Sequence, residues 1–172
     1  MIVARHAQSL WNLHFGRTRT DPGIPDTPLT DLGRRQAHAL AERLARFEIG
    51  RLVASPYRRT LETAAIVAAR LGCPVTVEPL VRERNAFSCD EGTPPDLLAE
   101  LWPDIDFGHV AADWWGRPVE SVGALLERAR SFRDLACGWD DRREVAVVSH
   151  WGFIRGLTGQ EIANAGFVRV VD

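Results

Sequence analysis

The chain alternates short apolar runs with longer stretches in which apolar residues recur every three or four positions. The short runs predict β-strands, and the periodic stretches predict amphipathic α-helices. Strands that alternate with helices indicate an α/β protein with a largely parallel sheet, covered by helices on both faces. The expected strands span residues 2–4, 51–54, 74–78, 144–149 and 167–171, and the expected helices span 30–47, 55–72 and 119–136, with shorter helices after Pro94 and after His150.

Two of these helices carry recognisable start signals. Thr30 is placed to cap the helix that runs to Phe47. Ser55 and Pro56 predict the start of the next helix, with the serine as N-cap and the proline at the first helical position. No internal repeat, low-complexity tract or linker divides residues 1–172, so we expect one domain, in which residues 84–118 form an irregular segment.

Composition excludes several kinds of partner. A hydrophobic content of 45% and a charged content of 26% are ordinary for a soluble globular protein. The net charge is −2 and no basic run occurs, so we expect no nucleic-acid partner. No apolar stretch approaches the roughly 18 residues of a membrane span, and no signal peptide precedes the first strand, so we expect no membrane partner. Three scattered cysteines, Cys73, Cys89 and Cys137, favour a reducing cytoplasm.

The basic residues also exclude certain chemistries. All 21 of them are arginines, and the chain contains no lysine. A lysine Schiff base, an anchored pyridoxal phosphate and the lysine of a phosphate-binding loop are therefore excluded. We expect no cofactor. Only four residues precede Arg5, and the sequence leaves open whether the natural chain starts upstream of Met1.

Charged and polar residues follow three of the predicted strands at the point where each strand ends. Arg5 and His6 follow the first strand, Arg58 lies just after strand 51–54, and His150 follows strand 144–149. Because the carboxyl ends of parallel strands lie along one edge of a sheet, we expect these residues to converge. Guanidinium groups bind phosphate oxygens in a bidentate manner, and helix N-termini add backbone donors. The sequence therefore predicts a phosphoryl-binding site at this edge.

Two other interpretations of these residues are weaker. Any one of them alone would more often be a structural or solvated side chain, but four at strand ends are poor choices for buried positions unless they are paired. A metal site would need ligand spacing, which His14, His38 and His109 lack, and neither an HExxH nor a CxxC motif occurs. Arginines would also repel a cation, so we expect no metal.

Five segments, in order, resemble the motifs of the histidine phosphatase superfamily, the phosphoglycerate mutase-like proteins. They read RHAQSLWN, DTPLTDLGRRQA, ASPYRRTLETA, EPLVRE and VVSHWGFI. The resemblance implies a three-layer α/β/α fold and a covalent phosphohistidine intermediate. It also implies a set of site residues, in which His6 is the nucleophile, Glu83 is the proton donor, and the remaining members bind the phosphoryl group: Arg5, Asn12, Arg58 and His150.

The reaction favoured by this resemblance is metal-independent hydrolysis of a small phosphorylated metabolite. A second possibility is a phosphoglycerate mutase-type phosphotransferase, although the chain is short for a cofactor-dependent mutase. A third is a non-catalytic protein that binds a phosphorylated ligand, which the presence of both His6 and Glu83 disfavours. A monomer and a homodimer both remain open.

Five further residues bear on the substrate and the acid. Arg82 and Arg84 flank the predicted acid and are candidates for contacts to the substrate, as is Trp151. Asp90 and Glu91 are alternative acids in the same irregular segment.

Trp114 and Trp115 are expected either to wall the pocket or, more commonly for an aromatic pair, to pack in the core. Cys89 is expected to be buried and inert rather than exposed and redox-sensitive.

Overall fold

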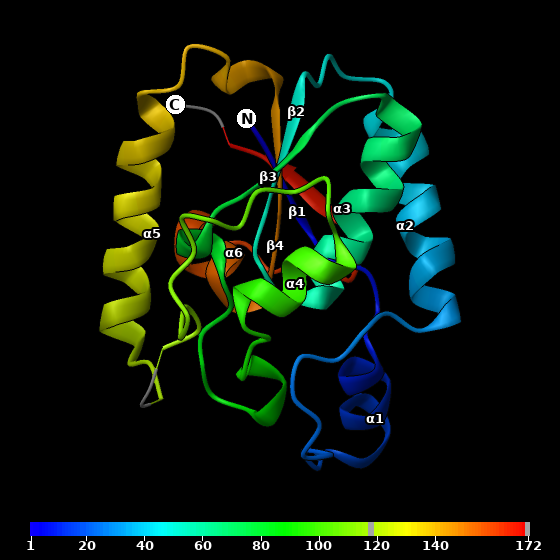
Figure 1. Cartoon of the computed structure of the whole chain (residues 1–172), viewed down its shortest axis with the longest axis vertical. Coiled ribbons are helices and arrows are strands. Elements are labelled where there is room, and N and C mark those ends of the chain that lie inside the picture. The colour runs from blue at the N-terminus through cyan, green and yellow to red at the C-terminus, as the bar shows by residue number, and fades with distance from the viewer. Residues whose placement is uncertain (117–118, 171–172) are drawn as a thin grey trace.

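The computed structural model describes residues 1–116 and 119–170, and within them five strands form one sheet in the order β3-β2-β4-β1-β5 (Figure 1). Residues 117–118, in the predicted irregular segment, and Val171, in the predicted last strand, lie outside the described residues. The strands are β1 (Ile2–Arg5), β2 (Arg51–Ala54), β3 (Val75–Val77), β4 (Val145–Ser149) and β5 (Phe167–Arg169). The helices are α1 (Leu10–Thr18), α2 (Asp31–Leu44), α3 (Arg58–Leu71), α4 (Pro95–Leu101), α5 (Val122–Cys137) and α6 (Trp151–Thr158), with short 3₁₀ turns η1 (Pro79–Val81), η2 (Ser88–Asp90) and η3 (Arg142–Glu144).

Both faces of the sheet are covered, which explains the runs of apolar residues in its central strands β1, β2 and β4. Ile2 and Ala4 of β1 belong to a buried cluster that includes residues of α2 and α3. Val3, between them, belongs to a second cluster on the opposite face, with residues of α5 and α6. Figure 1 shows the same division, with α2 and α3 on one side of the sheet and α5 and α6 on the other. The predicted three-layer α/β/α fold is confirmed.

The register of the sheet brings three strand ends to one edge. β1 pairs with β4 in parallel, with Arg5 opposite Ser149, and β2 pairs with β4 in parallel, with Ala54 opposite Val148. β5 is antiparallel to β1. The sheet is therefore largely parallel, as predicted, and the residues that follow β1, β2 and β4 leave the sheet side by side.

Of the two predicted helix starts, one is confirmed and one is wrong. The Thr30 hydroxyl accepts a hydrogen bond from the Gly33 amide at 2.9 Å, so Thr30 caps α2. Helix α3 begins at Arg58, and its N-cap is Tyr57 rather than Ser55. Ser55 instead continues the sheet, because its amide donates to the Val148 carbonyl at 3.2 Å.

Helix α1 was not expected from the apolar pattern, because it has no core-facing side. None of its residues is buried. It begins with a capping box, in which the Asn12 amide donates to Ser9 Oγ and the Asn12 side chain accepts from the Ser9 amide. In Figure 1 it projects from the edge of the sheet where the functional strand ends meet.

In the irregular segment after β3, Trp114 and Trp115 pack into the core. Trp114 and Trp115 both belong to the buried cluster beneath α2 and α3. The Trp114 ring packs edge-on against the Tyr57 ring, with ring centroids 4.5 Å apart. The Trp114 indole nitrogen donates to the Thr93 carbonyl. The expectation of core packing is confirmed. No helix in residues 1–116 or 119–170 is long and apolar enough to cross a membrane.

Candidate active site

His6 is held in one tautomer at the end of β1. Its Nδ1 lies 2.7 Å from the Ala7 carbonyl, and because a carbonyl only accepts, Nδ1 carries the proton. The ring is 3% exposed and lines a cavity of about 480 Å³. Burial, together with the positive charges of Arg59 and Arg5, holds the pKa of His6 well below its usual value. His6 is therefore a neutral imidazole whose Nε2 carries a free lone pair.

His150 packs behind His6, as the strand ends predicted. The two rings meet edge-on with centroids 5.2 Å apart. The His150 Nδ1 accepts a hydrogen bond from Arg59 Nε at 3.3 Å, so Nε2 carries the proton and donates to Ser55 Oγ at 2.9 Å. His150 is fully buried, and its contact with a phosphoryl group stays a prediction.

Arg5 points into the same cavity and keeps an unused donor. One terminal nitrogen donates to the Ile162 carbonyl at 3.0 Å, while Nε is buried with no hydrogen-bond partner. An orphaned guanidinium N–H is costly to bury, and because Arg5 lines the cavity, a ligand there could supply the missing acceptor. Burial lowers the pKa of Arg5, although the Glu83 carboxylate opposes this effect.

The second arginine in the cavity is Arg59 rather than the expected Arg58. Arg59 is 3% exposed and forms a buried ion pair with Asp90 at 3.1 Å. It also donates to the Cys89 carbonyl at 2.7 Å. Arg58, which does not line the cavity, is half-buried, and its amide donates to Asp26 at 2.9 Å.

Helix geometry explains this correction. Successive residues of an α-helix point about 100° apart, so Arg58 and Arg59 cannot share a direction. Arg59 lies on the buried face with Thr63, whose hydroxyl accepts from the Ala7 amide at 3.1 Å. Arg58 lies one turn before Glu62, on a more exposed face. The charged spacing of Arg58 and Glu62 was a signal in the sequence that Arg58 faces away.

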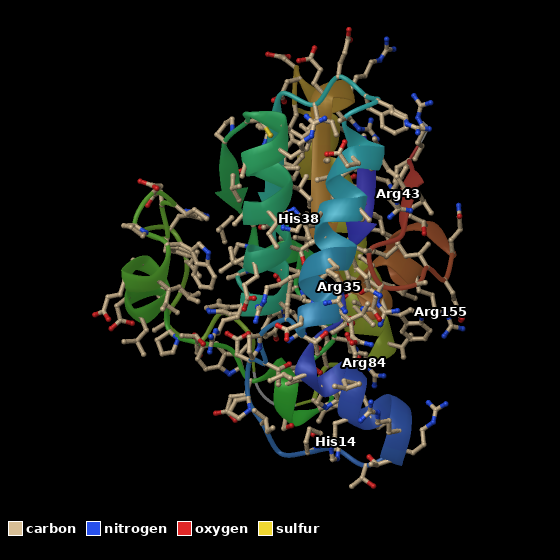
Figure 2. The ribbon with its side chains drawn as sticks, turned by 90° about the vertical axis from the view of Figure 1, so that its right-hand side faces the viewer. His14, Arg35, His38, Arg43, Arg84 and Arg155 are labelled. Carbon is tan, nitrogen blue, oxygen red and sulfur yellow. The ribbon has the colours of Figure 1, made fainter. Side chains whose placement is uncertain are left out.

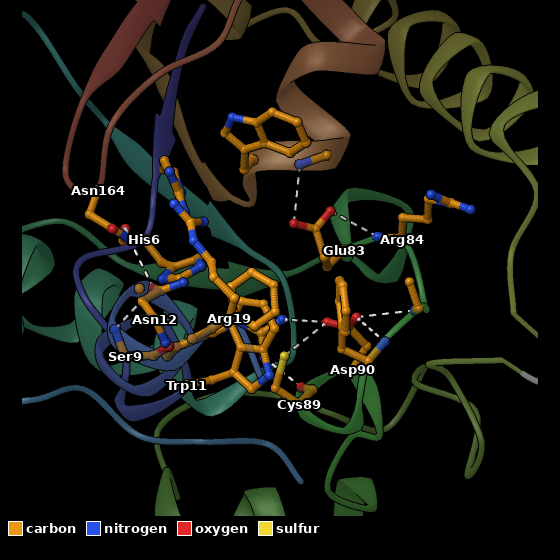
Figure 3. A pocket seen from close by; sticks show the side chains of 18 residues that line it. His6, Ser9, Trp11, Asn12, Arg19, Glu83, Arg84, Cys89, Asp90 and Asn164 are labelled. Carbon is orange, nitrogen blue, oxygen red and sulfur yellow. Dashed lines mark hydrogen bonds and ion pairs between the residues drawn. The ribbon is translucent and has the colours of Figure 1, made fainter. Parts of the chain in front are cut away.

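Glu83 lies at the N-terminus of α6, across the cavity from β1 (Figure 3). Its two carboxylate oxygens accept hydrogen bonds from the amides of Gly152 at 3.1 Å, Phe153 at 3.2 Å and Arg84 at 2.8 Å. A Cβ at position 152 would lie 2.5 Å from a Glu83 oxygen, so this approach requires glycine. Burial and the nearby Asp90 charge raise the pKa of Glu83, which favours the protonated form.

Asn12 also lines the cavity, at the start of α1. Its side-chain oxygen accepts from the Asn164 side chain at 3.1 Å, and Asn164 also donates to the His6 carbonyl at 3.1 Å. With the oxygen engaged, the Asn12 amide nitrogen remains as the donor for a ligand. Asn164 was not anticipated, because no motif marks the loop before β5.

Only two of the three predicted substrate contacts line the cavity. Trp151 and Arg84 line the cavity, whereas Arg82 does not. The Arg84 side chain is directed away from His6 and donates to the Glu120 carbonyl at 2.8 Å (Figure 3). Arg82 lies near the Glu120 carboxylate at 3.5 Å, in a group of charges behind the cavity.

Of the alternative acids, Asp90 lines the cavity and Glu91 does not. Asp90 is committed to Arg59 and to two backbone amides of its own turn, those of Ala86 and Phe87. Cys89 is buried, as expected, and burial raises the pKa of its thiol.

No metal-binding cluster is found in the part of the chain that the structure describes, where no three His, Cys, Asp or Glu side chains are grouped suitably. His14 on α1 and His38 on α2 are both exposed and stand on separate helices (Figure 2). The cavity lining instead includes the guanidinium groups of Arg5, Arg19 and Arg59, whose positive charges suit an anion.

Several residues that sequence reasoning missed complete the cavity lining. Most of them come from α1 with its flanking residues and from the turn around η2, and the others lie on α3, on α6 and in the loop before β5. These residues are Ser9, Trp11, Phe15, Gly16, Arg19, Arg59, Ala86, Phe87, Gly152 and Asn164.

Curated relatives match much of the chain. A protein described as a probable phosphoglycerate mutase, GpmB, from Erwinia tasmaniensis is 28% identical over 157 residues, which cover 87% of this chain and 68% of the relative. A protein of the same description from Yersinia pestis is 37% identical over 105 residues, covering 59% of this chain and 46% of the relative. The second match thus spans less than half of that relative.

Solved structures and a family model also match most of the chain. A mycobacterial glucosyl-3-phosphoglycerate phosphatase has a TM-score of 0.65 at 25% identity, covering 97% of this chain and 87% of that one. A mutant phosphoserine phosphatase from Entamoeba histolytica, in complex with phosphoserine, shares the fold with a TM-score of 0.64 at 22% identity, covering 96% of this chain and 87% of that one. The model of the histidine phosphatase superfamily (branch 1) matches residues 1–164. The chain belongs to this superfamily.

Proposed function

We propose that the protein hydrolyses a phosphomonoester of a small metabolite, without a metal ion, through a phosphohistidine formed on His6. The observation that carries the proposal is the state of His6. It is neutral, its Nδ1–H is fixed by the Ala7 carbonyl, and it lines a cavity together with Arg5 and Arg59, whose charges act on it. A neutral imidazole nitrogen beside fixed cations is suited to attack a phosphorus atom that carries negative charge.

The proposed first step transfers the phosphoryl group. Arg5, Arg59 and the side-chain NH₂ of Asn12 hold the phosphoryl oxygens, and the unpaired Arg5 Nε supplies one of the donors. His6 Nε2 forms a bond to phosphorus while the bond from phosphorus to the ester oxygen breaks. The departing oxygen takes a proton from Glu83, so the products are a neutral alcohol, a phosphohistidine and a Glu83 carboxylate.

The proposed second step restores the enzyme. The Glu83 carboxylate removes a proton from water as the water oxygen attacks phosphorus, and the bond from phosphorus to His6 breaks. Inorganic phosphate leaves, His6 is again neutral and Glu83 is again protonated. The guanidinium groups of Arg5 and Arg59 supply the positive charge that a metal ion supplies in other phosphoryl-transfer enzymes.

Product analysis tests this proposal against the mutase alternative, which the description of the curated relatives favours. We expect inorganic phosphate from several alkyl monoesters, with no bisphosphoglycerate requirement and with full activity in excess EDTA. Phosphate release and phosphoglycerate isomerisation should be measured in the same reactions. Efficient isomerisation with little released phosphate would make the protein a mutase, and loss of activity in EDTA that a divalent ion restores would refute the metal-free mechanism.

A matched pair of variants tests which arginine serves the site. We expect Arg59→Ala to lower kcat/KM for every monoester by about 10²- to 10³-fold, because a buried cation that neutralises the phosphoryl group is lost. Arg58→Ala, one residue away and outside the cavity, should change kcat/KM by less than about threefold.

Because Arg59→Ala also leaves Asp90 buried without its partner, thermal unfolding of both variants must accompany the kinetics. Arg59→Lys, which keeps a charge, separates loss of charge from loss of fold. A greater kinetic defect in Arg58→Ala than in folded Arg59 variants would return the role to Arg58.

A further inference from the structure

Three aromatic side chains form one wall of the cavity, which we call the aromatic wall: Trp11 and Phe15 of α1 and Phe87 beside η2. The Trp11 and Phe15 rings are stacked with centroids 4.5 Å apart and 11° between their planes. Phe87 closes the group, at 5.0 Å from Trp11 and 5.5 Å from Phe15. All three line the cavity that also contains His6. Figure 3 shows Trp11 on the same side of the cavity as Asn12 and Cys89.

The aromatic wall does not serve the core of the protein. No residue of α1 is buried, and Phe87 is 44% exposed. Neither of the two buried clusters includes any of the three rings. Exposed large apolar groups that gather at a cavity indicate a binding surface. The rings of Trp11, Phe15 and Phe87 are therefore available to a ligand.

The Asp21 carboxylate connects the part of the aromatic wall on α1 to the part beside η2. Asp21 accepts a hydrogen bond from the Trp11 indole nitrogen at 3.1 Å and from the Ser88 amide at 2.8 Å, and it also pairs with the Ser88 hydroxyl. Trp11 belongs to α1, and Ser88 follows Phe87 in the chain. Because the rings are held in place before a ligand arrives, little ordering cost remains to be met on binding.

Of the polar side chains near the aromatic wall, three are engaged by other protein groups, whereas Arg19 lies over the Phe15 ring, with its Cζ 6.0 Å from the ring centroid. Ser9 Oγ accepts from the Asn12 amide as a helix cap, and the Asp90 carboxylate is bonded to Arg59 and to backbone amides. Arg84 donates to the Glu120 carbonyl. A sugar or glycerate with several hydroxyls would also need acceptors here, which Arg19 does not provide, and buried polar groups that find no partner are costly.

We propose, building on the proposed hydrolase function, that the substrate is the phosphate ester of an alcohol that carries an aromatic or fused ring. The phosphoryl group lies at His6 and the ring contacts Trp11, Phe15 and Phe87. The cavity, at about 480 Å³, is within the size range of sites for small organic ligands. Ring faces attract other rings in stacked or edge-on geometry, which adds to the burial of apolar area.

Two alkyl esters with matched leaving oxygens test this proposal. Naphthylethyl phosphate and ethyl phosphate differ only in a ring two carbons away from the ester oxygen, so their chemistry at phosphorus is alike. We expect the wild-type kcat/KM ratio to favour the ring-bearing ester by about 10- to 100-fold. Phe87→Ala and Phe15→Ala, on separate elements, should each lower this ratio by about three- to tenfold. Leu10→Ala, also on α1 and 41% exposed but outside the cavity lining, should leave the ratio unchanged.

Binding of uncleavable analogues separates this proposal from the hydrolase function. Naphthylethylphosphonate and ethylphosphonate should differ in calorimetric Kd by the same factor in the wild type, and Phe87→Ala should reduce the difference. If both esters are hydrolysed with equal kcat/KM and both phosphonates bind equally, the ring-bearing substrate class is refuted while the hydrolase function stands. If neither ester is hydrolysed but the ring-bearing phosphonate binds tighter through Phe87, the ligand class stands and the hydrolase function fails.

Discussion

His6→Ala is expected to reduce phosphate release by about 10³-fold or more, because the variant lacks the only group proposed to form a bond with phosphorus. Wild-type enzyme quenched during turnover of a labelled ester should carry phosphate that is labile in acid and stable in base, as a phosphohistidine is. The His6→Ala variant should carry none. Rapid denaturation followed by filter-bound counting at several pH values measures both properties.

The control for this experiment must separate loss of the nucleophile from loss of structure. His6 is buried against His150, so its removal leaves a small cavity, and thermal unfolding should show a modest decrease in stability. His38→Ala, on the exposed face of α2, is the matched histidine control and should retain full turnover. Near-normal turnover by a folded His6→Ala protein, or trapped phosphate that remains in that variant, would refute covalent catalysis at His6.

The sheet could be predicted well because burial on both faces imposes a simple pattern. Strand β4 is buried at every position and apolar at the first four, and the polar residue that ends such a run marks the edge of the sheet. Parallel pairing then brings His6 and His150 together without any knowledge of contacts. The start of α3 could not be predicted from its Ser-Pro pair, because Ser55 is used by the sheet and by His150 rather than by the helix.

The site was predictable where a residue follows a strand directly, and less so where it lies on a helix. Arg5 and His6 were placed correctly because a strand end fixes their position. Choosing between the adjacent Arg58 and Arg59 required the orientation of α3, which a strand end does not fix. The Asp90 pairing with Arg59 depends on the path of an irregular turn, and nothing local in the sequence specifies that path.

The aromatic wall was missed for a related reason. Helix α1 contributes no side chain to the core, so Trp11 and Phe15 produce no pattern that predicts a packed helix. Their capping residues, Ser9 and Asn12, also serve the cavity lining. Hydrophobic periodicity identifies side chains that pack in the core. The rings of Trp11, Phe15 and Phe87 belong to neither buried cluster, so no such pattern marks them.

Glu83→Gln is expected to slow an alkyl monoester by about 10²- to 10⁴-fold and an aryl monoester far less. An alkoxide leaving group is a strong base that needs a proton as it departs, whereas p-nitrophenolate is a weak base that does not. Phenethyl phosphate and p-nitrophenyl phosphate are the appropriate pair, because both carry a ring and so engage the aromatic wall alike. The measured quantity is the ratio of their kcat/KM values in wild type and variant.

The pH dependence of kcat/KM is a second measure of proton donation by Glu83. Burial and the Asp90 charge raise the pKa of Glu83, and the acid form is the one that donates. Wild-type kcat/KM for phenethyl phosphate should therefore fall as pH rises through this raised pKa. Burial and the arginine charges lower the pKa of His6, so protonation of the nucleophile should limit the rate only at lower pH. Glu83→Gln should remove the alkaline decline for the alkyl ester.

Glu83→Gln also weakens hydrogen bonds between this side chain and the backbone. That loss affects both esters equally, so it cancels in the ratio of their kcat/KM values. Both carboxylate oxygens accept backbone amides, from Arg84 and Phe153 on one and Gly152 on the other. The glutamine NH₂ must face one of these donors, which costs about 1–3 kcal/mol and affects both esters equally. Asp90→Asn, which weakens the hold on Arg59, should likewise slow both esters to the same extent, and Glu91→Gln, outside the cavity lining, should slow neither. A selective alkyl defect in Asp90→Asn, or equal slowing of the two esters by Glu83→Gln, would move the acid role away from Glu83.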